Sequence, residues 1–490
     1  MTSLRSVLLS LLVICGLVAG CFGGSRPQKA PGSALWLTAD SGEFSAEAQG
    51  RLAALGLKEV FLDAAEIEWA GNPRLRHLAA PTIPRRTPAT LVVSGRWLSG
   101  DRPPDGLATA LLSELSALRV EAEQRGLVVV GYHFEVEAGD HAESLAKTLG
   151  RLRTLLGGNY FVSAGFGRKA LAEPQAKTIA DGVDFVVGMI YGQRPGEAED
   201  PTAWDLVSVE ESFRRLEGLK RPYFTGAVTL GTAALRGRGG ETRAVSTALS
   251  LGDLIQTRNL ELKPGFSLQG IDRQVWEFVA RGPTHAGPWD LAPGESIRVV
   301  RTATPFLEEF RRRLGAWEST HRLGDVLYRL RRDDERLSLS VDNLADVLAP
   351  DATAPVLDLS LEKVSAFANR WIVKVRLANR SSESTDLAYL DSNFVQLQIA
   401  GAKIGAAAPG GFQRIELLVD GERGTMRAFR EANTVRLYLP LLAENQEVAS
   451  GEIELKLAQR APTLALSASF LLADGRDLTL EPRDWQFEKP

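Results

Sequence analysis

The chain has very few cysteines. Among its 490 residues only Cys15 and Cys21 occur, and both lie near the amino terminus. If residues 1–20 are removed on export, Cys21 alone remains, so an internal disulfide is excluded. A chain of several hundred residues can do without one, because it buries enough apolar surface to be stable unaided.

Long apolar runs and an excess of basic charge are also missing. After residue 18 no apolar run approaches the roughly 20 residues that a membrane-spanning helix needs. The 57 basic residues are outnumbered by 61 acidic ones. Without Arg5 the counts are 56 and 61, a net charge of −5. A nucleic-acid-binding protein would usually show a concentrated basic face, so no nucleic-acid partner is expected.

The amino terminus has the layout of an export signal. Arg5 precedes an apolar run, Val7 to Val18, and small residues follow. The stretch Val18-Ala19-Gly20-Cys21 resembles the bacterial lipobox, in which cleavage precedes a cysteine that then carries lipid. We therefore expect a signal peptide at 1–20 and a lipidated tether at 21–32. A single transmembrane anchor is the alternative, but the apolar run is short for it.

This interpretation predicts a protein of the cell envelope, held to a bacterial membrane through lipid on Cys21. Phe22 follows the cysteine where enterobacterial lipoproteins of the inner membrane carry aspartate, which favours the outer membrane. The segment from Phe22 to Pro31 is rich in glycine and proline and is typical of a flexible tether.

From residue 33 to 350, short apolar runs alternate with amphipathic helical patterns, which indicates a parallel α/β architecture. Eight such runs predict a (β/α)8 barrel of the TIM type. The expected strands are Ala34–Thr38, Glu59–Asp63, Thr90–Ser94, Val128–Glu137, Tyr160–Gly165, Asp184–Tyr191, Tyr223–Leu230 and Asp325–Leu330. The expected helices include Leu107–Arg125, His141–Leu156, Pro305–Trp317 and Leu337–Leu348.

Two regions depart from this alternation. Residues 264–303 contain two strand-like runs joined by a Gly/Pro-rich loop, and predict a β-rich insertion after the seventh strand. Residues 356–490 contain short alternating strands without a convincing helix, and predict a C-terminal β-sandwich.

The fourth expected barrel strand carries an unusual row of polar residues. Successive side chains of a strand point to opposite faces, so His133, Glu135 and Glu137 share one face while Tyr132 and Phe134 share the other. In a barrel the apolar face packs against helices, so the polar face points inward near the carboxyl end, where active sites of this fold are built. Neighbouring carboxylates raise one another's proton affinity, which suits general-acid chemistry. The alternative is a structural network closed by arginines such as Arg96 and Arg168.

Other strand ends offer further candidates for contacts to a ligand. On the sixth strand Tyr191 and Gln193 share a face, and the tyrosine hydroxyl can donate to a ligand. Trp36 and Trp97 can stack on sugar rings, and Asp63 can supply a polar contact. Core packing is the alternative for both tryptophans and for Tyr191. No second histidine accompanies His133, so neither a metal nor another cofactor is expected.

These residues resemble the motifs of chitinase-like family-18 glycoside hydrolases. The segment from Gly131 to Glu137 has the spacing of that family's Gly-x-Asp-x-Asp-x-Glu motif, and Met189-Ile190-Tyr191-Gly192 matches its Met-x-Tyr-Asp motif. The resemblance implies that Glu137 is the acid, that Glu135 orients the substrate and that Tyr191 contacts the reacting group. His133, Glu135 and Gly192 replace the family's aspartates.

The chain also resembles domain-of-unknown-function family 3142, whose members are similar to degenerate hydrolase barrels and are often lipoproteins. The likeness runs from Gly131 to Arg329 and implies the barrel fold. Two hypotheses follow. The first is an envelope-anchored, carbohydrate-binding barrel that hydrolyses a glycan. The second is a non-catalytic glycan-binding or structural envelope lipoprotein, which the three replacements favour.

Overall fold

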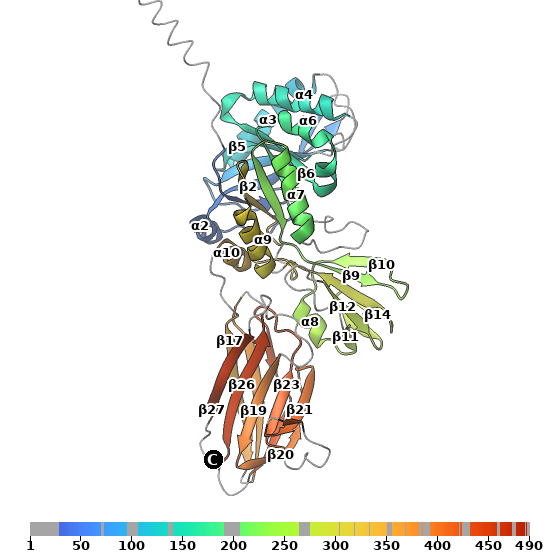
Figure 1. Ribbon diagram of the computed structural model, residues 1–490, viewed down its shortest axis with the longest axis vertical. Helices are drawn as coiled ribbons and strands as arrows, with labels where there is room; N and C mark the ends of the chain where they lie inside the picture. Colours follow the sequence, from blue (N-terminus) through green and yellow to red (C-terminus); the bar gives the residue numbers. More distant parts are fainter. Residues whose placement is uncertain are drawn as a thin grey trace, which may run out of the picture.

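The fold is known from a computed structural model. It describes residues 29–69, 73–95, 106–135, 141–190, 206–263, 275–302, 304–317, 319–332, 334–349, 355–367, 369–381, 385, 393–420, 422–423, 432–457, 461–472, 477–485 and 487. These residues form an elongated molecule with a helix-covered barrel at one end and a β-sandwich at the other (Figure 1).

Eight parallel strands close into a barrel, as the alternating pattern predicted. Each strand pairs in parallel with the next, and β1 pairs with both β2 and β16 to complete the ring. The strands are β1 (Ser33–Leu37), β2 (Leu57–Trp69), β4 (Pro88–Ser94), β5 (Val128–Glu135), β6 (Phe161–Gly167), β7 (Phe185–Met189), β8 (Tyr223–Val228) and β16 (Arg322–Tyr328). The predicted (β/α)8 barrel is therefore confirmed.

Helices cover the outside of this barrel (Figure 1). They are α2 (Ala46–Ala54), α3 (Leu107–Gln124), α4 (Ala142–Leu155), α5 (Arg168–Ala172), α6 (Gln175–Asp181), α7 (Leu206–Gly218), α9 (Thr304–Ala316) and α10 (Val341–Leu348), with a short 3-10 turn at Gly157–Asn159. Helix α3 buries Leu111, Leu115 and Leu118 at helical spacing. Helix α10 begins with a capping box between Ser340 and Asn343. None of the helices in the described part combines the length and apolar character required to cross a bilayer.

Between β2 and β4 the described residues form a strand instead of a helix. Strand β3 (Pro73–His77) runs antiparallel to β2 and packs near α3. The segment carries Arg74 and Arg76 and is too polar for its sequence to indicate a strand.

A second sheet is inserted between β8 and α9. It is antiparallel in the order β10-β9-β15-β12-β11, beside a β13-β14 hairpin and helix α8 (Leu251–Gln256). Its strands are β9 (Thr232–Arg236), β10 (Thr242–Ser246), β11 (Leu260–Leu262), β12 (Val275–Ala280), β13 (Thr284–Ala286), β14 (Trp289–Leu291) and β15 (Ser296–Val300). The insertion begins at Thr232, well before the expected residue 264. Its first two strands were not predicted because β9 and β10 are short and β10 is half exposed.

The C-terminal residues form two packed antiparallel sheets. One contains β17 (Leu357–Phe367), β18 (Arg370–Asn379), β20 (Ala402–Ala407), β24 (Glu447–Ala449) and β25 (Ile453–Leu457). The other contains β19 (Phe394–Ala400), β21 (Arg414–Val419), β22 (Glu422–Arg423), β23 (Thr434–Tyr438), β26 (Thr463–Leu471) and β27 (Asp477–Trp485). Their inner faces share one core, centred on residues such as Trp371, Val373 and Leu397.

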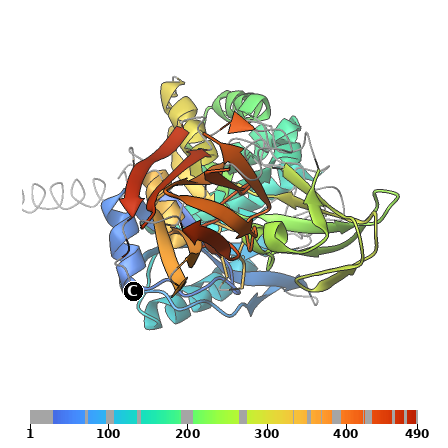
Figure 2. The ribbon, with the colours of Figure 1, turned by 90° about the horizontal axis from the view of Figure 1, so that it is seen from below.

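The insertion connects the barrel to the sandwich. Leu337, from the loop after β16, and Leu441, from the sandwich, join the apolar core of the insertion. Ile255 packs against both this core and the core of the sandwich. Viewed from below, the sandwich lies in front of the barrel with the insertion beside it (Figure 2).

Candidate functional site

Strand β5 turns alternate side chains toward the barrel interior. The ring centroid of His133 lies 5.3 Å from those of Trp36 on β1 and Phe61 on β2, with the rings edge to face. On the other face the Tyr132 hydroxyl donates to the carbonyl of Leu115 in helix α3, at 2.9 Å. The predicted alternation of inward and outward side chains is therefore observed at Tyr132 and His133.

His133 is neutral and fully buried. Its Nδ1 lies 2.9 Å from the hydroxyl of Ser163, which itself donates to the Tyr132 carbonyl. Because that proton is already used, the geometry assigns the histidine proton to Nδ1 and leaves Nε2 as an acceptor. Nε2 has no hydrogen-bond partner among the described residues. A Cβ at Gly165 would lie only 2.6 Å from Nε2, so this position requires glycine.

Burial gives His133 an expected effect on stability. Desolvation lowers the pKa of His133 from 6.5 to about 3. Between these two pH values His133 therefore binds a proton in the unfolded chain but not in the folded chain. Stability is lost as pH falls from 6.5 towards 3, by about 1.4 kcal/mol per pH unit. We expect His133→Gln to remove this slope, which urea unfolding from pH 7 to pH 4 measures. An unchanged slope would contradict the assignment.

Trp36 belongs to the barrel core. Its side chain is 0% exposed, stacks on Phe61 at 5.5 Å and meets Tyr328 edge to face. Its Nε1 donates to Oδ1 of Asp63 at 2.7 Å. The ring therefore has no open face for a sugar, which corrects the stacking role expected for it. The strand pattern showed which way the side chain points but not how deeply it is covered.

Two predicted carboxylates lie on barrel strands, Glu135 at the carboxyl end of β5 and Asp63 in the middle of β2. Glu135 is the last residue of β5 and is half buried, and Asp63 on β2 is half buried beside Trp36. The other predicted site residues lie outside the described residues: Glu137, Tyr191, Trp97, Gln193 and the lipidation candidate Cys21. Of the arginines considered as partners, Arg96 is also outside them, and Arg168 begins helix α5.

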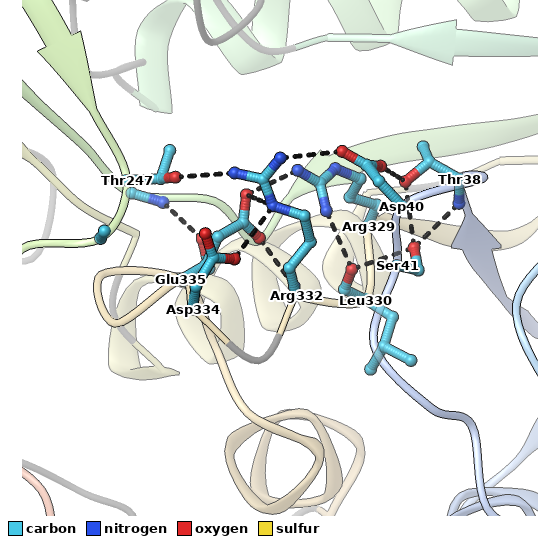
Figure 3. Close-up of polar contacts among 12 residues, drawn as sticks. Thr38, Asp40, Ser41, Thr247, Arg329, Leu330, Arg332, Asp334 and Glu335 are labelled. Carbon is cyan, nitrogen blue, oxygen red and sulfur yellow. Dashed lines mark hydrogen bonds and ion pairs between the residues drawn. The ribbon is translucent and has the colours of Figure 1, made fainter.

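A charged network that the sequence pattern did not predict lies at the carboxyl ends of β1 and β16 (Figure 3). Glu335 is fully buried and accepts hydrogen bonds from Nη2 of Arg329, at 2.6 Å, and from the backbone N–H of Arg332, at 2.9 Å. Arg329 is also buried and donates to the Leu330 carbonyl. A buried carboxylate and a buried guanidinium thus compensate one another.

Arg332 joins three parts of the chain in this network. Its guanidinium donates to Asp40 in the loop after β1, at 2.9 Å, and to Thr247 of the insertion, at 3.2 Å (Figure 3). Burial tends to raise the pKa of Asp40, but the Thr38 hydroxyl and the charges of Arg329 and Arg332 outweigh it, so that pKa lies below its ordinary value. Asp40 therefore stays ionised at neutral pH and holds the insertion loop against the barrel through Arg332.

The signal for this network was the charged run from Arg329 to Glu335. Loops after the strands of such a barrel build its functional face. The described part of the chain contains no group of three or more histidine, cysteine, aspartate and glutamate side chains placed to hold a metal.

Comparisons with known proteins find a likeness among solved structures only. No family profile matches the chain, and no curated protein matches its sequence. A putative chitinase C-terminal domain from Desulfitobacterium hafniense aligns over 66% of this chain and 100% of its own, with 12% identity and a TM-score of 0.45. The spore cortex-lytic enzyme SleL of Bacillus cereus aligns over 67% and 76%, with 14% identity and a TM-score of 0.40.

A chitinase from Cycas revoluta, solved with (GlcNAc)3, aligns over 65% of this chain and 100% of its own, with 12% identity and a TM-score of 0.41. At these scores and identities the likeness carries no argument about a substrate. The site must be judged on its own residues.

Proposed function

We propose that the carboxyl face of the barrel binds a polysaccharide of the bacterial envelope and hydrolyses a glycosidic bond in it. The observation that carries the proposal is the position of Glu135, an ionisable side chain at the carboxyl end of β5 above a neutral, buried His133. Since His133 holds no proton to give on Nε2, acid catalysis falls to carboxyl groups. Glu137 is proposed as the acid and Glu135 as the group that orients the substrate.

The place of action is part of the same proposal. A signal peptide at residues 1–20 directs export, lipid on Cys21 anchors the mature chain, and the outer membrane is the favoured site. Mass spectrometry of the membrane fraction tests the anchor. We expect a diacylglycerol-modified Cys21 at the new amino terminus, and an unmodified chain that begins at Met1 would refute it.

Hydrolysis is tested by release of reducing ends from amino-sugar and bacterial polysaccharides. We expect Glu137→Gln to lower turnover by at least about a hundredfold, because general-acid catalysis contributes that much. Glu135→Gln should lower it as well. Glu143→Gln is the matched control, because Glu143 is an exposed glutamate in the first turn of α4 and should leave turnover unchanged. Equal turnover by all four proteins would remove both carboxylates from the mechanism.

A non-catalytic, glycan-binding barrel is the second candidate. The replacements at His133, Glu135 and Gly192 favour it, and the first of these side chains is buried in the barrel core without an exposed surface. This function predicts that a polysaccharide pull-down retains the protein and that no reducing ends are released. The Glu137→Gln variant should bind the polysaccharide as well as the unchanged chain does.

A further inference from the structure

The amino-terminal segment is fixed to the floor of the barrel, the end where the strands begin. Lys29 is almost buried, and its Nζ lies 2.5 Å from Oε2 of Glu59 on β2. The same ammonium group lies over the rings of Phe161 and Phe185, the first residues of β6 and β7, at 5.0 and 5.4 Å. Because these strands stand across the ring from β2, Lys29 closes the barrel floor from within.

Backbone bonds hold the next residues in the same place. Gly32 donates to the carbonyl of Leu323, and Ser33 donates to that of Gly56. Cys21 precedes Lys29 by eight residues, which span at most about 27 Å when extended. A membrane anchor at Cys21 would therefore keep the floor of the barrel close to the bilayer.

The same end of the barrel carries unpaired positive charge. Five basic side chains in the segments that begin or precede strands are exposed and have no carboxylate partner among the described residues: Lys58, Arg85, Arg86, Arg125 and Lys220. The stem of Lys58 lies directly against Gly32, where the amino-terminal segment enters β1.

Most carboxylates at this end are paired with basic side chains. Asp184 pairs with Arg153 at 2.6 Å, and Asp325 pairs with Arg322 at 2.6 Å. The other ion pairs are Glu59 with Lys29, Asp181 with Lys177 and Arg221, and Glu123 with Arg119. Glu121 and Glu217 contact His77 and His321, and these two carboxylates are fewer than the five basic side chains without a carboxylate partner. The face therefore has a net positive charge, although the chain as a whole is acidic.

Apolar side chains are also exposed at this end of the barrel. Val128, the first residue of β5, is 48% exposed, and Leu155, the last residue of α4, is 40% exposed. Val120, near the end of α3, is 42% exposed. Exposed apolar side chains flanked by arginine and lysine are typical of surfaces that rest in the interface of an anionic membrane.

We propose that this amino-terminal face of the barrel docks on the anionic headgroups of a lipid bilayer. The five unpaired basic residues meet the phosphates, and Val128 and Leu155 enter the boundary between headgroups and acyl chains. The carboxyl ends of the strands, with Glu135 and the Asp40 network, then open away from that membrane. The proposal stands apart from the glycan function, which involves the opposite end of the barrel.

Vesicle sedimentation tests the docking without the lipid anchor. A chain that begins at Gly24 lacks Cys21 but keeps Lys29 and all three apolar cores, which contain no residue before Ala34. We expect it to sediment with vesicles of phosphatidylglycerol and phosphatidylcholine in equal parts, to stay in solution with phosphatidylcholine alone, and to be released by salt. Each basic residue near an anionic surface is worth about a fivefold change in affinity.

The decisive variant is therefore Arg85→Gln combined with Arg86→Gln, which should weaken binding by about 25-fold. The matched control combines Lys403→Gln with Lys456→Gln, two exposed neighbours on β20 and β25 of the sandwich. The control should bind like the parent chain. Equal affinities for both double variants, or no binding to the anionic vesicles at low salt, would overturn the proposal.

A fluorescent label reports the depth of the face. The chain from Gly24 contains no cysteine, so a single introduced cysteine can carry a polarity-sensitive dye. We expect the dye at Val128→Cys to shift to shorter wavelength on anionic vesicles, and the dye at Val364→Cys, an exposed valine of the sandwich, to keep its spectrum. A shift at both positions would indicate partial unfolding on the vesicle, and a shift at neither would remove the apolar contact; either result contradicts the proposed docking.

Discussion

Replacing Glu335 by alanine should lower the free energy of unfolding by about 3–5 kcal/mol, because it leaves a buried guanidinium without its counter-charge. The Arg329 side chain is 10% exposed and that of Glu335 is 0% exposed, so water cannot replace the lost partner. The backbone N–H of Arg332 loses its acceptor in the same step. The change removes the carboxylate that organises the whole loop between β16 and α10.

Urea unfolding followed by circular dichroism measures this effect. The matched control is Asp334→Ala, because Asp334 is the preceding residue and contacts the same Arg332, yet is 67% exposed. An exposed pair of this kind is worth at most about 1 kcal/mol. If Glu335→Ala and Asp334→Ala lower the free energy of unfolding by the same amount, the buried ion pair of Arg329 and Glu335 does not stabilise the fold as proposed.

Trp371→Ala should destabilise the sandwich by about 3–5 kcal/mol, because it empties the largest buried side chain between the two sheets. The ring is 1% exposed, contacts Phe487 at 5.8 Å and lies under the ammonium group of Lys363. Phe367→Ala is the matched control, since Phe367 stands at the end of β17 and is 52% exposed. It should cost well under about 1 kcal/mol.

Scanning calorimetry can separate the sandwich from the barrel. We expect Trp371→Ala to lower the temperature of one transition and to leave the transition of the barrel in place, because Trp371 belongs to the apolar core of the sandwich, which includes no residue of the barrel strands. A single transition that shifts as a whole would show that the barrel and the sandwich unfold together. The apolar contacts of Ile255 and Leu441 with the insertion would then not be the full extent of the coupling.

The barrel could be predicted because its strands are buried on both sides. The run Val128 to Gly131 is apolar over its whole length, and Tyr223 to Val228 is buried throughout with Thr225 as its polar residue. Helices with regular leucine spacing separate such runs. Such a pattern is specific to a parallel sheet covered by helices. The predicted strands agree with the observed ones to within a few residues, apart from the longer β2.

The start of the insertion could not be predicted, because its first strands depend on tertiary contacts. Strand β9 is short, and besides its neighbour β10 it pairs with β15, which lies far along the chain. Strand β10 has polar and apolar residues without a clear buried face. Local sequence cannot reveal a pairing of this range.

The sequence predicted which way the side chains of the candidate site point, but not how deeply they are buried. Strand alternation placed His133 inside the barrel, and its neighbours there confirm that orientation. The same rule could not reveal that Trp36 is sealed by Phe61 and Tyr328, because burial depends on strands remote in sequence. The ion pair of Arg329 and Glu335 was hidden in a charged run that reads as an exposed surface loop.

The chain leaves the barrel to form the insertion and returns to it at two neighbouring positions. Thr232, at the start of β9, is paired with Val300, at the end of β15, so the two ends of this long excursion are neighbours in one antiparallel ladder. Neighbouring residues in such a ladder are about 5 Å apart, a gap that a tight turn can close. The insertion is therefore a module that evolution or an engineer can exchange without cutting a barrel strand, and its loss would remove the contacts through which the sandwich is held.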